Sequence, residues 1–155
     1  MITLDLAGSW TCIPCAGPGP TLPKRIPASV PGCVHHDLET AKLIEDPYVG
    51  ENELALQWVG ERAWIYERRF TVRPDLLAAD RVELVCEGLD TLATISINGR
   101  ELAKTDNMFR AWRFDIAEEL KPGENRISIR FQAPTPYARE RGQRQPMGNP
   151  GAAAH

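Results

Sequence analysis

Cys12 and Cys15 form a C-x-x-C pair, which is the spacing of redox dithiols and of half a zinc site. A redox pair normally opens a helix, whose end lowers the thiolate pKa, but the glycines and prolines of residues 16–20 cannot begin a helix. A zinc site needs a second pair at close spacing, and Cys33 and Cys86 stand alone. We therefore expect four unlinked thiols, mostly buried, in a reducing compartment that we take to be the cytoplasm. The alternative is a fortuitous metal or disulfide site.

Two imidazoles and a carboxylate follow one another at His35, His36 and Asp37, and metal binding is the chemistry they suggest. Apolar residues at helical spacing predict a short helix around them, from about residue 35 to residue 42. Adjacent residues on a helix point about 100° apart, so these three side chains cannot converge on one ion. Asp37 instead suits the first turn, where the helix macrodipole favours a carboxylate. The sequence thus predicts no metal site and no cofactor.

Most elements that would position these side chains are strands. Apolar and polar residues alternate with period two in several short segments, which turn residues separate. This pattern predicts an all-β fold, an antiparallel β-sandwich of jelly-roll type with one short helix. Pro27 makes its strand an edge strand, because proline cannot donate to a ladder. The expected strands are 6–11, 26–30, 64–72, 82–86, 93–97, 112–116 and 127–131.

One tight turn is predicted at Asn98 and Gly99, because both residue types tolerate the positive φ that a two-residue hairpin turn requires. We expect the strand at 82–86 to pair with this hairpin. In the loop that follows the hairpin, Asp106 and Asn107 either cap a turn or orient a neighbouring domain.

The tryptophans raise the possibility of sugar stacking. Trp64 and Trp112 are in phase with apolar strand positions, which favours burial over an exposed binding face. Trp58 lies in the turn-rich segment 46–60, which we interpret as a loop. Its indole either packs over the strand that begins at Trp64, which we favour, or faces a substrate cleft.

Composition excludes several classes of function. The 155 residues are 43% hydrophobic and 25% charged, which is typical of one ordinary globular domain. The formal net charge is -3, so the chain lacks the excess of positive charge that is typical of nucleic-acid-binding domains. No apolar run approaches the roughly 18 residues that a membrane span needs, and no secretory signal is visible. We therefore expect neither a nucleic-acid partner nor a membrane.

Five stretches along the chain carry one recognisable pattern: 31–35 (PGCVH), 46–48 (DPY), 64–70 (WIYERRF), 87–99 (EGLDTLATISING) and 105–110 (TDNMFR). In these stretches, and in their order, the chain resembles the N-terminal sandwich domain of β-mannosidases in glycoside hydrolase family 2. The resemblance covers most of residues 1–140 and implies a galactose-binding-domain-like jelly roll over that range. Residues 141–155 are expected to be an unstructured or truncated tail.

The resemblance implies an accessory domain of a retaining hydrolase that removes terminal β-D-mannose residues. Such a domain helps to shape the active-site mouth, while both catalytic glutamates lie on a separate (β/α)8 barrel. No catalytic residue is therefore expected in this chain. The expected partners are carbohydrate and the rest of the parent enzyme, namely its immunoglobulin-like and barrel domains. The alternative, from a different class, is a free-standing carbohydrate-binding module.

Asn52 and Glu53 resemble the Asn-Glu pair whose glutamate is the general acid/base of this family. That pair ends a barrel strand, about 5 Å from the opposing glutamate of a retaining enzyme. Here the pair lies in an early loop, so we interpret the match as a coincidence. Family members use a loop of this domain to border the active site, which leaves Asn52 and Trp58 as candidate substrate-binding residues. The competing role for Asn52 is that of an ordinary turn asparagine.

Overall fold

The structure is a computed structural model, and it describes residues 2–144. Short segments of alternating apolar residues become strands, and the proline- and glycine-rich segments between them become loops. The elements are β1 (Gly8–Pro14), β2 (Ile26–Val30), α1 (Val34–Thr40), α2 (Asn52–Ala55), the 3-10 helix η1 (Gln57–Glu61), β3 (Trp64–Val72), α3 (Pro74–Leu77), β4 (Glu83–Cys86), β5 (Ala93–Ile97), β6 (Arg100–Thr105), β7 (Trp112–Asp115), β8 (Gly123–Phe131) and α4 (Pro134–Arg144).

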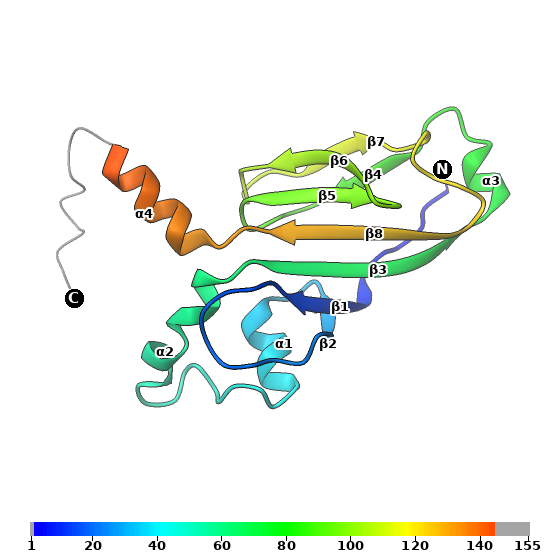
Figure 1. The fold of residues 1–155 in the computed structure, drawn as a ribbon. Helices are drawn as coiled ribbons and strands as arrows, with labels where there is room; N and C mark the ends of the chain where they lie inside the picture. Colours follow the sequence, from blue (N-terminus) through cyan, green and yellow to red (C-terminus); the bar gives the residue numbers. More distant parts are fainter. Residues whose placement is uncertain (1, 145–155) are drawn as a thin grey trace.

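Two antiparallel sheets make up the fold (Figure 1). The larger sheet has the strand order β2-β1-β3-β8-β5-β6, and within residues 2–144 the smaller sheet consists of β4 and β7. Buried side chains from both sheets belong to one hydrophobic core. The prediction of an all-β antiparallel sandwich is confirmed, and β2, which contains Pro27, lies at a sheet edge as expected.

Alternation along the strands decides which face of the larger sheet is buried. Tyr66 of β3 and Ile129 of β8 lie opposite each other in register, and both are buried. Most residues that point the other way are polar, although Ile13 and Ile65 lie on that face, and Arg69 pairs there with Glu124 at 2.7 Å. Both of these side chains are mostly exposed, so the ion pair contributes little to stability. Burial on one face alone holds the sheet against the core.

The predicted hairpin turn is confirmed. Asn98 and Gly99 join β5 to β6 with φ values of 53° and 85°. The Asn98 side chain also ties the turn to β8: its Oδ1 accepts from the Arg126 N–H at 3.0 Å, and its Nδ2 donates to Asn125 Oδ1 at 2.8 Å. Asn125 is 1% exposed, so the turn is anchored to a buried polar group.

The predicted partner of the 82–86 strand is wrong. This strand, β4, pairs with β7 in the smaller sheet, with Leu84 opposite Phe114. The hairpin strand β5 already lies between β6 and β8, so both of its edges are occupied. The outer edge of β6 pairs with no strand among residues 2–144, but β4 lies in the other layer of the sandwich, where Leu84 is buried in the common core.

Helix α1 confirms the predicted short helix, displaced by one or two residues. Asp37 lies in its first turn as expected, but the role of this side chain extends beyond the helix. Asp37 is 3% exposed, and its Oδ1 accepts from the Ser29 N–H of β2 at 3.0 Å. Its Oδ2 accepts from the Tyr66 hydroxyl of β3 at 2.5 Å. One carboxyl group therefore joins three elements.

Three helices, α2, η1 and α4, extend into segments that we interpreted from the sequence as a loop or a tail. Segment 46–60 contains α2 and most of η1. The last helix, α4, begins at Pro134, since proline is tolerated in a first helical turn, and it continues past the boundary predicted at residue 140. Arg139 of α4 pairs with Glu61 of η1 at 3.5 Å. The rest of the predicted tail lies outside the described residues. Within residues 2–144, no helix is long and apolar enough to cross a bilayer.

The four cysteines differ in exposure. Cys12 is buried, Cys15 and Cys86 are half-buried, and Cys33, just before α1, is exposed. Burial, and next the nearby Asp37, raise the pKa of Cys12 to about 12. Burial raises the pKa of Cys86 to about 11. The expectation of mostly buried thiols is thus wrong, because only Cys12 of the four is buried.

The free energy of unfolding is expected to fall as the pH rises above about 9. Above that pH the unfolded Cys12 thiol ionises, while the folded thiol, with a pKa near 12, stays protonated. Cys12 alone should lower stability on the order of 1 kcal/mol between pH 8 and pH 10. Urea unfolding at both pH values measures the loss, which Cys12→Ala should reduce and the control Cys33→Ala should not. An equal loss in Cys12→Ala would contradict the assignment.

Candidate functional site

Loops gather at one end of the sandwich. The strand register places one residue from each of five strands in a single row across the larger sheet: Pro14, Trp64, Phe131, Ala93 and Thr105. The loops that leave this row project from the same end, on the left of Figure 1, whereas the N-terminus lies at the right. We call this the loop end, and it comprises loops 15–25, 87–92 and 106–111 together with the connection 41–63, which contains α2 and η1 and is called loop 41–63 below. Both segments singled out from the sequence, 46–60 and 105–110, therefore lie at this end, one leading into β3 and the other following β6.

Trp58 is packed on both sides. Its ring centroid lies 6.3 Å from that of Trp64, with the planes inclined at 44°. From loop 15–25, Gly19 approaches so closely that a Cβ there would lie 2.5 Å from the indole. Gly19 also has a φ of +97°, which glycine tolerates best. Trp58 thus packs over the start of β3, and its contact with a substrate stays a prediction.

Arg62 completes this packing. The side chain is 6% exposed, and its guanidinium carbon lies 5.4 Å from the Trp58 ring and 6.0 Å from the Trp64 ring. Its Nη2 donates to the Gly17 carbonyl at 2.9 Å, whereas its buried Nε has no hydrogen-bond partner. A guanidinium over two indole faces is held by cation–π attraction. Arg62 therefore fastens loop 15–25 to β3, a role that no local sequence signal indicates.

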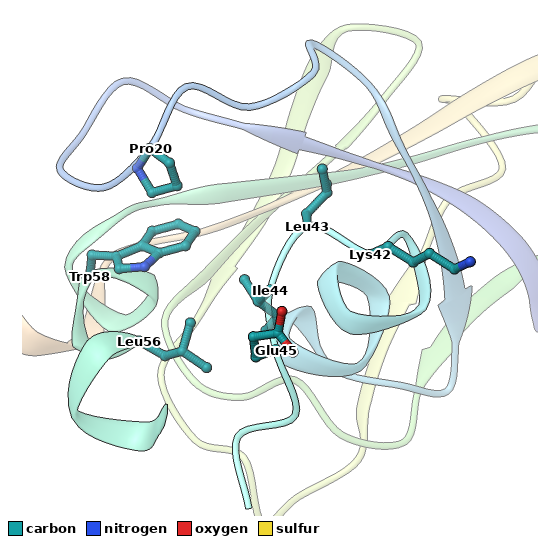
Figure 2. A pocket seen from close by; sticks show the side chains of 7 residues that line it. All are labelled: Pro20, Lys42, Leu43, Ile44, Glu45, Leu56 and Trp58. Atoms are coloured by element: carbon teal, nitrogen blue, oxygen red, sulfur yellow. The ribbon is translucent and has the colours of Figure 1, made fainter. Parts of the chain in front are cut away.

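A hollow of about 240 Å³ opens beside Trp58 (Figure 2). Its apolar side chains could pack against the apolar face of a sugar ring, and Figure 2 shows Pro20 next to the indole and the Lys42 amine pointing away from it. Glu45 is the one carboxylate that lines it, whereas glycoside hydrolysis needs two. The hollow could therefore bind a sugar but has no groups to cleave one. Its lining residues are Pro20, Lys42, Leu43, Ile44, Glu45, Leu56 and Trp58.

Asn52 lies apart from this hollow. It is the first residue of α2, and its Nδ2 donates to the Asp46 carbonyl at 2.9 Å, which closes the loop between them. This is the ordinary turn role considered for it. Its neighbour Glu53 is exposed. The structure thus brings the two candidate substrate-binding residues to the same loop end but places only Trp58 at the hollow.

Asn107 caps the turn in loop 106–111, one of the two roles predicted for it. Its Oδ1 accepts from the Phe109 N–H at 2.8 Å, and its carbonyl accepts from Trp112 Nε1 at 3.1 Å. Arg110 lies over the Trp112 ring, with its guanidinium carbon 4.3 Å from the ring centroid. These contacts give the loop a defined shape.

The predicted absence of a metal site rests on the spacing of His35, His36 and Asp37. Both histidines are exposed, whereas Asp37 is buried between α1, β2 and β3. Across residues 2–144, no three side chains of His, Cys, Asp or Glu converge in a way that could hold a metal ion.

Comparisons with known proteins agree on one family of glycoside hydrolases. The family model described as "Glycosyl hydrolase 2 galactose-binding domain-like" matches residues 15–155. A β-mannosidase of Bos taurus is 38% identical over 144 residues, which is 93% of this chain and 16% of that protein. β-Mannosidase B of Emericella nidulans is 38% identical over 76% of this chain and 14% of its own length.

Solved structures agree with these relatives. The crystal structure of a β-D-mannosidase from Dictyoglomus thermophilum matches 95% of this chain and 18% of its own, with a TM-score of 0.87 and 40% identity. A β-glucuronidase of Bifidobacterium dentium, at 21% identity and a TM-score of 0.61, shares the fold. This chain thus spans 14–18% of the length of these mannosidases.

Proposed function

This chain belongs to the glycosyl hydrolase 2 galactose-binding domain-like family, and we propose that it is the N-terminal accessory domain of a β-mannosidase-like retaining glycoside hydrolase. The observation that carries the proposal is an identity of 38–40% over nearly the whole chain to mannosidases of which it spans less than a fifth. The parent enzyme removes terminal β-D-mannose residues with two glutamates on a (β/α)8 barrel. An immunoglobulin-like domain and a cytoplasmic location complete the proposal.

The domain contributes one wall of the active-site mouth through its loop end. Loops 41–63 and 106–111 project from this end, and the hollow beside Trp58 offers apolar surface to a sugar ring. Loops on a rigid sandwich are the parts that can reach across to a neighbouring barrel. Contacts of this kind orient the sugar and leave the chemistry to the barrel. Asn52 would act here by shaping its loop, since its amide is bonded to Asp46.

The isolated chain is expected to show no hydrolysis of β-mannosides. Retaining hydrolysis needs two carboxyl groups about 5 Å apart, one protonated and one ionised, and the hollow has the single carboxylate of Glu45. Release of 4-nitrophenol from its β-mannoside, compared between this chain and the full-length enzyme, measures the difference. Turnover by the isolated chain that Glu45→Gln or Glu53→Gln abolishes would overturn the proposal.

A free-standing carbohydrate-binding module is the second candidate, and the hollow beside Trp58 is what favours it. Calorimetric titration of the isolated chain with mannose and β-linked manno-oligosaccharides discriminates between the two. Saturable binding that Trp58→Phe weakens would support a module. Activity of the full-length enzyme that depends on this domain, without sugar binding by the isolated chain, would support the accessory role.

A further inference from the structure

A second hollow, of about 340 Å³, opens where loop 15–25 lies against Arg62. Two cations, Lys24 and Arg62, line this hollow, and among the described residues that line it none is an aspartate or a glutamate. The other lining residues lie between positions 14 and 22, and they include the half-buried thiol of Cys15 and the hydroxyl of Thr21. A hollow lined by charges of one sign concentrates ligands of the opposite sign. This one therefore favours anions, and it holds one thiol.

The charge of Arg62 has no counter-ion within residues 2–144. Its side chain is 6% exposed, its buried Nε has no hydrogen-bond partner, and none of the ion pairs among these residues includes it. A buried charge is costly unless an opposite charge pairs with it. The Trp58 and Trp64 rings and the Gly17 carbonyl offset part of this cost, but none of them carries a negative charge. An anion in the adjoining hollow would supply one.

Backbone contacts fix Cys15 beside Arg62 in the wall of the hollow. The Cys15 N–H donates to the carbonyl of Ala63, the next residue after Arg62, at 3.0 Å. A Cβ at Gly17 would lie 3.3 Å from the Arg62 Cβ, so this part of the loop runs directly along the Arg62 side chain. The bond from Arg62 Nη2 to the Gly17 carbonyl holds the two segments together. A molecule that the cations attract into the hollow therefore arrives next to the thiol.

We propose that this hollow binds small disulfides that carry carboxylates, and that Cys15 is a site of S-thiolation by them. Lys24 and Arg62 attract the carboxylates, and binding brings the disulfide bond of the reagent to Cys15. Cys15 gives its proton to water, its thiolate sulfur attacks one sulfur of the reagent, and the disulfide bond of the reagent breaks. The other half leaves as a thiolate, which takes up a proton. Cys15 is thereby oxidised to a mixed disulfide, and half of the reagent is reduced to a free thiol.

The rates at which two reagents modify Cys15 and Cys33 test this proposal. Dithiobis(nitrobenzoate) carries a carboxylate on each half, whereas dithiodipyridine is uncharged at neutral pH. Cys33 is exposed and serves as the internal control, and peptide mass spectrometry gives the rate at each cysteine. The ratio of the anionic to the neutral rate is expected to be about tenfold larger at Cys15 than at Cys33. High salt should shrink this difference by screening the cations. Equal ratios at both cysteines would overturn the proposal.

Three variants assign the preference to the cations of the hollow. Lys24→Gln should reduce the preference of Cys15 for the anionic reagent severalfold, because it removes one lining cation. Lys42→Gln is the matched control: it removes a cation that lines the hollow beside Trp58 and should leave the preference unchanged. Arg62→Met keeps an apolar chain over the indoles and should remove most of the preference. Lys24 is exposed, so Lys24→Gln decides the case if Arg62→Met fails to fold. An unchanged preference in Lys24→Gln would contradict the site.

The full-length enzyme provides a separate test of the same site. The preference for the anionic reagent is expected at Cys15 there as well. If neither reagent modified Cys15 in that enzyme, the proposal would be overturned, because another part of the polypeptide would then occupy the hollow. None of these rates depends on mannoside hydrolysis, so failure of the proposed function would be recognised separately.

Discussion

Replacing Trp58 by alanine is expected to lower the free energy of unfolding by about 2–3 kcal/mol, less than for most fully buried tryptophans, because Trp58 is half-buried. The indole fills the space between Gly19 and Trp64, and Arg62 stacks on it. Its loss would free loop 15–25 from the start of β3. Urea unfolding of the isolated chain, followed by tryptophan fluorescence, measures the change.

Gly19→Ala is the matched control, because it disturbs the same contact and leaves Trp58 intact. The new Cβ would lie 2.5 Å from the indole, at a φ of +97°, and should cost about 2 kcal/mol. Gly99→Ala adds a methyl group at a positive φ in open space and so reports the backbone cost alone. If Trp58→Ala and Gly19→Ala both left stability unchanged, the packing role would be wrong.

Trp58→Phe separates packing from sugar contact. A phenyl ring keeps most of the contact with Trp64 but lacks the outer part of the indole beside the hollow. In the full-length enzyme this variant is expected to lower kcat/KM by about tenfold, because small displacements of a bound substrate are costly. An unchanged kcat/KM would leave Trp58 with a structural role alone.

Replacing Asp37 by alanine is expected to lower the free energy of unfolding by about 3 kcal/mol, from two lost hydrogen bonds in the core. The Tyr66 hydroxyl and the Ser29 N–H would both lose their acceptor. Helix α1 would then be held against the sheet by apolar contacts such as those of Leu38. Urea unfolding at pH 7 measures the loss.

A double-mutant cycle with Tyr66→Phe isolates the Asp37–Tyr66 bond. Tyr66→Phe alone should cost about 1–2 kcal/mol, and the double variant should lose less than the sum of the single losses. Burial, and next the hydrogen bond to Asp37, raise the pKa of Tyr66 well above its ordinary value. Strict additivity in the cycle would mean that the two side chains do not depend on each other.

Local features of this fold could be predicted from the sequence. The alternation in 93–97 specifies a strand with one buried face, because successive side chains point to opposite faces. Asn98 and Gly99 specify the turn, because few other residues tolerate positive φ. Pro27 specifies an edge, because it lacks a donor. Each is a property of a few neighbouring residues, and each was predicted at nearly the right position.

Long-range choices were decided only by the tertiary structure. The pattern in 82–86 predicts a strand, but that strand pairs with β7 in the smaller sheet and not with the hairpin. An aspartate such as Asp37 suits the first turn of a helix. Its burial, however, depends on Ser29 of β2 and Tyr66 of β3, which the tertiary structure brings to it. Period-two alternation is the same for every strand, so it does not indicate which other strand will be the hydrogen-bonded partner.

For the candidate site, too, some features were determined by the sequence and others by the tertiary structure. The sequence by itself determined the family resemblance, the absence of a paired catalytic motif and the two segments that could reach a substrate. The tertiary structure decided that both segments lie at one end, that Trp58 is held by Gly19 and Arg62, and that Asn52 is bonded within its own loop. The physical reason is that composition and short-range spacing act through backbone preferences, whereas a site is assembled from residues that only chain reversal and strand register bring together.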